Sequence, residues 1–143
     1  IDRNLRIRAD KNQLRQVLIN LIENGIKYNV PQGGVRIELS QTKRADKMIL
    51  NIEDTGIGID EADLPRVTER FFRVDKSRSR ERGGTGLGLA IVKHIIEAHG
   101  ETLKIRSEPN KGSKFSISLT RVDVDENSHS PDEATFSEIS RGK

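Results

Sequence analysis

Two asparagines and a lysine share one face of a predicted helix. Asn20, Asn24 and Lys27 are spaced by four and three residues, so at about 100° per residue they project together, with Gln13 and Gln16 beside them. Amide oxygens suit Mg²⁺ when a phosphate is also bound, and an ammonium group pairs with phosphate oxygens. The spacing indicates a site for a metal-chelated phosphate, but a plain solvated face has the same pattern.

A carboxylate stands directly before a glycine turn. Asp54 is followed by Thr55, Gly56, Ile57 and Gly58. Such a carboxylate can accept a hydrogen bond from the exocyclic amine of adenine while the glycine backbone closes on the flat ring. It can equally form an Asx turn that only organises the loop. The spacing alone leaves both interpretations open.

Glycines also precede a second predicted helix, at Gly83, Gly84, Gly86 and Gly88. Backbone N–H groups in such a loop form an anion site together with the helix N-terminus, although flexible hinges look the same. Neither the Walker A nor the Rossmann glycine pattern is present. Residues 70–82 hold six bases and two acids, which indicates either an anionic partner or a solvated flexible loop.

The elements that must position these residues follow from apolar periodicity. Steps of three and four residues predict helices, alternation predicts strands, and Asp10 is a suitable N-cap for the first helix. The predicted strands are 4–9, 35–39, 48–52, 103–105 and 115–119. The first predicted helix follows Asp10 and ends before Pro31, and two more helices are predicted at 64–72 and 87–99. Two adjacent-strand pairs argue against a doubly wound fold. We therefore predict an α+β chain, a two-layer α/β sandwich with a mixed sheet of about five strands and about three helices.

Length and composition restrict the domain organisation. The 143 residues suffice for one domain, expected at residues 1–120. Residues 121–143 hold six acids and three bases with little to bury, so we expect a disordered acidic tail. No apolar run approaches the ~18–20 residues of a bilayer span. The chain has no Cys and only 3% aromatic residues, which excludes disulfides and thiolate zinc sites and argues against base stacking.

Four motifs in order resemble a known family. They are QVLINLIENGIKY (16–28), DTGIG (54–58), ERFFR (69–73) and GTGLGL (84–89). They are similar to the N, G1, F and G2 boxes of the catalytic ATP-binding domain of bacterial sensor histidine kinases, over about residues 5–120. The resemblance is nearest to kinases of OmpR-like regulators, with the phosphate-sensing type closest. It implies the Bergerat-type α/β sandwich with a mobile ATP lid that is shared with gyrase B, Hsp90 and MutL.

The resemblance also implies roles for individual residues, with ATP and Mg²⁺ as cofactors. Asn20, Lys27 and Arg73 would be the catalytic residues, and Asn24 with Asn20 would hold Mg²⁺. The residues expected to bind the nucleotide are Asn24, Lys27, Tyr28, Asp54, Gly56, Gly58, Arg70, Arg73, Gly84, Thr85, Gly86, Leu87 and Gly88. Three positions depart from the family pattern: Gly25 for Ala, Thr68 for an aromatic residue and Glu101 for Gly.

The implied activity is transfer of the γ-phosphate of MgATP to a histidine. Hydrolytic relatives typically carry Glu at the position of Asn20, and an amide cannot act as a base, so a kinase is favoured over an ATPase. His94, His99 and His129 lack the surroundings of a phosphoacceptor, which we expect on separate dimerisation helices of a longer, membrane-anchored receptor. This chain would be its cytoplasmic catalytic domain, acting on a response regulator indirectly and touching neither nucleic acid nor membrane. The alternatives are a nucleotide-binding regulatory module and a gyrase- or MutL-like ATPase.

Overall fold

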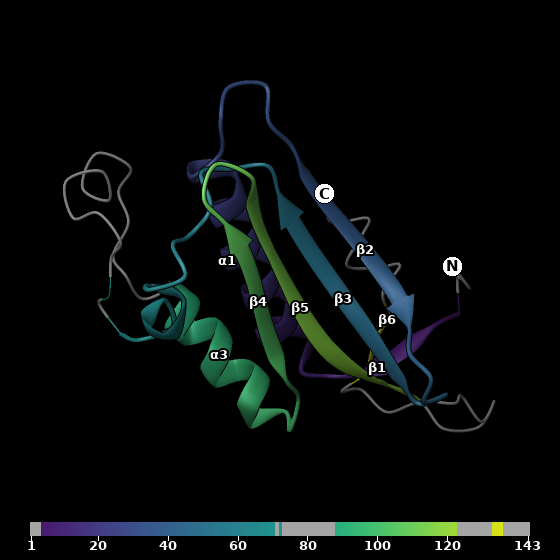
Figure 1. Cartoon of the computed structure of the whole chain (residues 1–143). Coiled ribbons are helices and arrows are strands. Elements are labelled where there is room, and N and C mark those ends of the chain that lie inside the picture. Colours follow the sequence, from purple (N-terminus) through teal and green to yellow (C-terminus); the bar gives the residue numbers. More distant parts are fainter. Residues whose placement is uncertain (1–3, 71, 73–87, 123–132, 136–143) are drawn as a thin grey trace.

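One antiparallel sheet and two α-helices form the two layers of the structure (Figure 1). The computed structural model describes residues 4–70, 72, 88–122 and 133–135. In chain order the elements are β1 (Arg6–Arg8), α1 (Lys11–Lys27), β2 (Val35–Gln41), β3 (Lys47–Asp54), the 3₁₀ helix η1 (Leu64–Arg66), α3 (Gly88–Ala98), β4 (Leu103–Glu108), β5 (Gly112–Arg121) and β6 (Glu133–Thr135). The two-layer α/β sandwich predicted from the sequence is confirmed.

The long strand β5 organises the sheet. One of its edges pairs with β3 over residues 113–120, and β2 continues the sheet beyond β3. Its other edge pairs with β4 over residues 112–117 and with β1 at Thr120 and Arg121. Every strand pair in the described residues is antiparallel, which corrects the predicted mixed sheet. Short turns join β2 to β3 and β4 to β5, and strands joined in this way run antiparallel.

The core lies between the helices and the inner face of the sheet. Alternation along β3 and β5 turns one set of side chains toward α1 and α3. The most deeply buried side chains come from both layers and are Ile7, Val17, Leu21, Leu50, Ile52, Val92 and Ile117. The Asp10 carboxylate accepts a hydrogen bond from the backbone N–H of Gln13 at 2.9 Å, so the predicted N-cap of α1 is confirmed.

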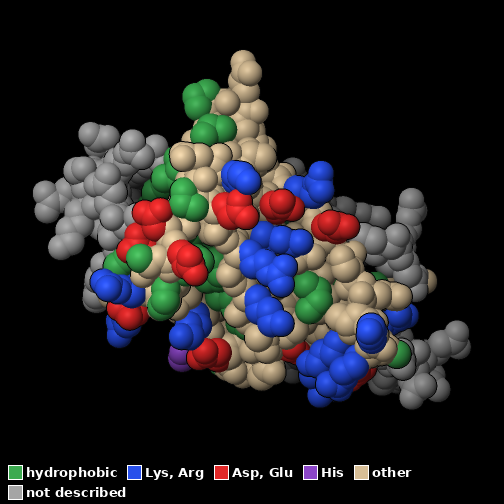
Figure 2. Space-filling view, in the orientation of Figure 1, with side chains coloured by type: hydrophobic (Ala, Val, Ile, Leu, Met, Phe, Trp, Pro, Cys, Tyr) green, Lys and Arg blue, Asp and Glu red, His purple; other side chains and the backbone are tan. Residues whose placement is uncertain are grey.

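The outer face of the sheet is polar (Figure 2). Register places Arg36 opposite Glu53, and Glu53 opposite Lys114, so opposite charges alternate across three neighbouring strands. Such cross-strand pairs stabilise a sheet. No helix in the described part of the chain is long and apolar enough to cross a bilayer.

Two sequence predictions differ from the structure. The helix predicted at residues 64–72 is only the three-residue 3₁₀ helix η1, followed by turns. Of the residues there that the structure describes, Val67 alone is a buried apolar side chain, so little packing supports a longer helix. Within the predicted disordered tail, β6 pairs with β1. The mobile loop predicted at residues 74–85, the region of the expected ATP lid, lies outside the described residues.

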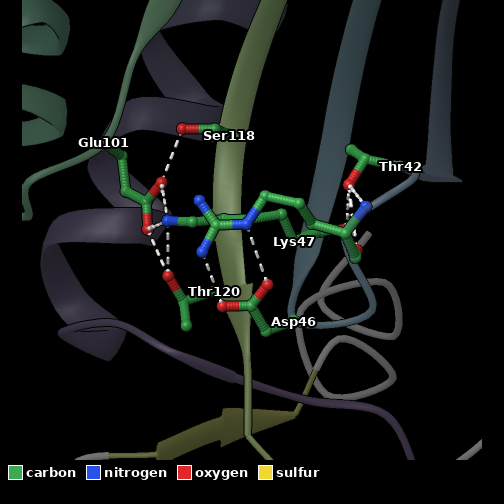
Figure 3. Close-up of polar contacts among 7 residues, drawn as sticks. Thr42, Asp46, Lys47, Glu101, Ser118 and Thr120 are labelled. Carbon is green, nitrogen blue, oxygen red and sulfur yellow. Dashed lines mark hydrogen bonds and ion pairs between the residues drawn. The ribbon is translucent and has the colours of Figure 1, made fainter.

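A partly buried ion pair ties the connection between α3 and β4 to the sheet (Figure 3). The Lys47 ammonium donates to both oxygens of Glu101, at 3.0 and 3.1 Å. The hydroxyls of Ser118 and Thr120 donate to the same carboxylate at 2.5 and 2.6 Å. Burial alone would raise the pKa of Glu101, but these donors outweigh it and hold the pKa below its ordinary value. Glu101 therefore has a structural role at the position where the family often has glycine.

Candidate functional site

The polar face of α1 meets the first residue of α3. The Asn20 amide donates to the backbone carbonyl of Gly88 at 3.3 Å. Its oxygen accepts a hydrogen bond from the Gln16 amide at 3.0 Å. Two predicted site residues, Asn20 and Gly88, are therefore brought together from distant parts of the chain.

The next two polar side chains on this face are available for a ligand. Asn24 is half-buried and Lys27 is exposed. Within the described residues, neither side chain has a hydrogen bond or an ion pair. An amide oxygen and an ammonium group on consecutive turns of one helix can meet a phosphate and its metal ion.

Gly25 brings α1 against the end of β3. A Cβ atom built on Gly25 would lie 3.4 Å from the Asp54 Cβ and 3.0 Å from a methyl group of Val35. A larger side chain would have to displace the strands or rotate Val35. Gly25 therefore allows the last turns of α1 to pack directly against the end of β3 at Asp54.

The two oxygens of Asp54 have different surroundings. Oδ1 accepts hydrogen bonds from the backbone N–H groups of Gly56, at 2.9 Å, and Ser113, at 3.3 Å. No hydrogen bond from the described residues reaches Oδ2. Burial raises the pKa of Asp54, and the two backbone hydrogen bonds offset this only in part. Asp54 thus forms the Asx-type turn and still offers one oxygen to a ligand, so the two interpretations left open by the sequence are compatible.

The turn after Asp54 is held between α1 and the β4–β5 turn. A Cβ atom on Gly56 would lie 2.3 Å from the Tyr28 carbonyl oxygen. Gly58 has a φ of +71°, and a Cβ atom there would lie 2.0 Å from the Glu108 carbonyl oxygen. Both glycines are required by close backbone approach and, at Gly58, by the left-handed conformation.

A serine from β4 completes this support. The Ser107 hydroxyl accepts a hydrogen bond from the backbone N–H of Ile59 at 2.8 Å, and it also contacts the hydroxyl of Ser113 at 2.7 Å. Ser107 and Ser113 are site-supporting residues that the sequence interpretation missed. They lie on two strands, β4 and β5, and nothing in the sequence indicated that these strand ends would face the glycine turn.

Two further predicted site residues lie in the described part of the chain, and the backbone of one of them, Tyr28, contacts the glycine turn after Asp54. Tyr28 is half-buried at the end of α1, and Arg70 is exposed after η1. The other predicted residues, Arg73, Gly84, Thr85, Gly86 and Leu87, lie outside the described residues.

The described histidines differ in their surroundings. His94 is exposed on α3. Nδ1 of His99 lies 2.8 Å from the Ile95 carbonyl oxygen, and Nε2 accepts a hydrogen bond from the backbone N–H of Asp10 at 3.0 Å. These contacts join α3 to the beginning of α1, a structural role for His99. His129 lies outside the described residues.

A comparison with protein families agrees with the four sequence motifs and with the packing of α1 against Asp54. Residues 9–123 match the family described as histidine kinase-, DNA gyrase B-, and HSP90-like ATPase. The chain belongs to this family. Domains of this ATPase family bind ATP. This agrees with the polar face of α1 and with the Asp54 carboxylate, of which only one oxygen accepts hydrogen bonds from the described residues.

Similar proteins of this ATPase family are sensor kinases. The chain is 43% identical over 122 residues to the phosphate regulon sensor protein PhoR of Pseudomonas aeruginosa, covering 85% of the chain and 27% of that protein. It is 39% identical over 118 residues to the sensor histidine kinase WalK of Bacillus subtilis, covering 82% of the chain and 19% of that protein. The chain therefore spans less than a third of the length of these relatives.

Solved structures of histidine kinases share the fold of this ATPase-family domain. The mycobacterial sensor histidine kinase MprB superimposes with a TM-score of 0.71 at 30% identity, covering 84% of this chain and 78% of that one. Full-length ShkA in complex with AMPPNP superimposes with a TM-score of 0.69 at 29% identity, covering 82% of this chain and 24% of that one.

Proposed function

We propose that this domain binds MgATP between α1, the turn after Asp54 and the beginning of α3, and donates the γ-phosphate to a histidine of a longer sensor kinase. The observation that carries the proposal is the Asp54 carboxylate, whose Oδ1 is held by two backbone N–H groups while Oδ2 meets no donor among the described residues. A half-buried carboxylate oxygen of this kind favours a ligand that carries a hydrogen-bond donor. The adenine N6 amine is such a donor.

Asp54 would select the base. Its Oδ2 would accept a hydrogen bond from the adenine N6 amine, whereas hypoxanthine and guanine present a carbonyl oxygen at that position. Two acceptors facing each other in a partly desolvated site repel, so these bases would bind more weakly. Gly56 and Gly58 would shape the wall beside the base, and Tyr28 would flank the nucleotide.

The phosphates would lie along the polar face of α1. Asn24, with Asn20, would hold Mg²⁺, whose charge would offset that of the phosphates, and Lys27 would pair with a phosphate oxygen. Arg73, with Arg70, would reach the γ-phosphate. The remaining phosphate contacts would come from the glycine motif, at Gly84, Thr85, Gly86, Leu87 and Gly88.

The proposed reaction is an in-line phosphoryl transfer. A neutral imidazole nitrogen of the acceptor histidine forms the P–N bond as the bond between Pγ and the β,γ-bridging oxygen breaks. The products are ADP and a phosphohistidine, and the imidazole proton leaves to water. Asn20 cannot take a proton from water, and Glu23 on the next turn is exposed, so no carboxylate on this face of α1 activates water for hydrolysis.

The relatives support the cellular setting of this proposal. ShkA has been solved with AMPPNP, and PhoR is named a phosphate regulon sensor. The acceptor histidine would lie on the dimerisation helices of the longer protein, and a response regulator would then receive the phosphate. The domain would act in the cytoplasm, where ATP is available, and phosphate is the signal that the likeness to PhoR favours.

Titration of fluorescent ATP, with and without Mg²⁺, tests the binding site. Wild type should bind it, Asn24→Ala should lose the Mg²⁺-dependent part of the affinity, and Glu23→Gln should bind as wild type because Glu23 is exposed on the same helix. Folded wild-type protein that binds no ATP would refute the proposal.

Phosphotransfer to an added dimerisation domain of a related kinase tests the activity. Labelled γ-phosphate should appear on the histidine of the added domain and not on this chain. ATP binding without any transfer would favour the regulatory module. Steady ATP hydrolysis by the isolated chain, lost in Glu23→Gln, would favour the gyrase- or MutL-like ATPase.

A further inference from the structure

A hydrogen-bonded link joins the end of α1 to the residue after Asp54. The Thr55 hydroxyl donates to Oδ1 of Asn29 at 3.0 Å and accepts from the backbone N–H of Gly34 at 2.8 Å. The Asn29 amide donates to the Gly34 carbonyl at 3.0 Å, and the Thr55 backbone N–H donates to the same carbonyl at 3.2 Å. Three segments that are separate in sequence are thus connected through two side chains.

The space for this link is specific to one glycine. A Cβ atom on Gly33 would lie 1.9 Å from Oδ1 of Asn29 and 2.7 Å from the Thr55 hydroxyl. A Cβ atom on the neighbouring Gly34 would meet nothing within 4 Å. A side chain at Gly33 would therefore disrupt the link, whereas a side chain at Gly34 would have room.

The link lies between the two halves of the candidate site. Asn29 follows Lys27 by two residues, and Thr55 directly follows Asp54. Beside it, the backbone N–H of Ile57 donates to the Tyr28 carbonyl at 3.0 Å. Asn29 is half-buried, Thr55 is exposed and neither belongs to the hydrophobic core. The contacts therefore set where the end of α1 lies relative to Asp54, more than they hold the fold together.

We infer that Asn29 and Thr55 are positioning residues that set the preference of this site for adenine. They contact no group of the proposed nucleotide and act by holding the backbone at Thr55 against the end of α1, so that Oδ2 of the preceding Asp54 faces the N6 position. This inference rests on the proposed function, because it requires Asp54 to read the base. It predicts that loosening the link weakens recognition of the amine and leaves the phosphate contacts unchanged.

The test compares ATP with inosine triphosphate, which carries a carbonyl in place of the N6 amine. In Thr55→Val the shape is kept and the hydroxyl is lost, so we expect ATP affinity to fall about fivefold, as for one or two exposed hydrogen bonds. Inosine triphosphate affinity should stay unchanged, and Thr55→Ser, which keeps the hydroxyl, should keep the preference for ATP. Gly33→Ala should act like Thr55→Val, and its matched control Gly34→Ala should bind as wild type.

The coupling to Asp54 is measured by a double-mutant cycle. In the Asp54→Asn background, Thr55→Val should have no further effect on ATP affinity. Equal losses for both nucleotides, or no loss in Thr55→Val and Gly33→Ala, would overturn the inference while the proposed function stands. If wild type bound both nucleotides equally, Asp54 would not read the base, and the proposed role of Asp54 and this inference would both be refuted. Because each variant is measured with two nucleotides, a partly unfolded fraction lowers both signals alike and leaves the ratio intact.

Discussion

Asp54→Asn should weaken ATP binding without lowering the stability of the free domain. The asparagine oxygen can keep both backbone hydrogen bonds that Oδ1 accepts at 2.9 and 3.3 Å. Its amide nitrogen would then replace Oδ2 and face the adenine amine, donor against donor. Loss of a hydrogen bond to a charged acceptor costs about 1.5–3 kcal/mol, so ATP affinity should fall about ten- to a hundredfold.

The same substitution should not destabilise the free domain. Burial raises the pKa of Asp54 above its ordinary value of 3.8, so the folded chain binds this proton more tightly than the unfolded chain. The contribution of Asp54 to stability then falls as the pH rises through the folded-state pKa, and stays low at neutral pH. Removing the charge should leave the domain equally or slightly more stable at pH 7, with the difference shrinking as the pH approaches 3.8.

Two measurements on the same samples check this prediction. Isothermal titration gives the ATP affinity, and urea unfolding between pH 4 and 8 gives the stability of the free domain. A variant that binds ATP as wild type would show that Asp54 does not meet the base. A variant less stable than wild type at pH 7 would show that the charge supports the fold, contrary to the burial seen here.

Three further substitutions have definite expected outcomes. Glu101→Gln should destabilise the domain by about 2–3 kcal/mol, because it leaves the Lys47 ammonium without its counter-charge. Since the fold lowers the pKa of Glu101, the loss of stability measured by urea unfolding should shrink below pH 4.5. Gly58→Ala should cost more than ~2 kcal/mol, because a Cβ atom at a φ of +71° would meet the Glu108 carbonyl; an unchanged melting temperature would contradict this. Gly25→Ala should raise the stability by up to ~1 kcal/mol through helix propensity, with the half-buried side chain of Val35 rotating away. A lower melting temperature would show that Val35 cannot move.

Local patterns sufficed for the two α-helices, for most of the strands and for grouping the polar side chains of α1 on one face. Alternation placed β2, β3 and β5, and the Asp10 cap with three- and four-residue steps placed α1. Since helical geometry fixes which side chains share a face, Asn20, Asn24 and Lys27 could be grouped before any tertiary contact was known. The order of the four motifs then indicated the family.

Tertiary contacts decided what local patterns could not. The way in which Asp54 organises its loop depends on a tertiary contact, because Oδ1 accepts a hydrogen bond from the backbone N–H of Ser113. The link between Asn29 and Thr55 joins residues that lie 26 positions apart, and no periodicity reports such a contact. The strand β6 forms only by adding to the edge of β1, which a polar composition does not predict.

A crystal structure of the domain with AMPPNP and Mg²⁺ tests the central claim most directly. The account predicts the adenine N6 amine at ~3 Å from Oδ2 of Asp54, with the phosphates along the face of α1 that carries Asn24 and Lys27. Adenine bound away from Asp54, or phosphates bound away from α1, would contradict it.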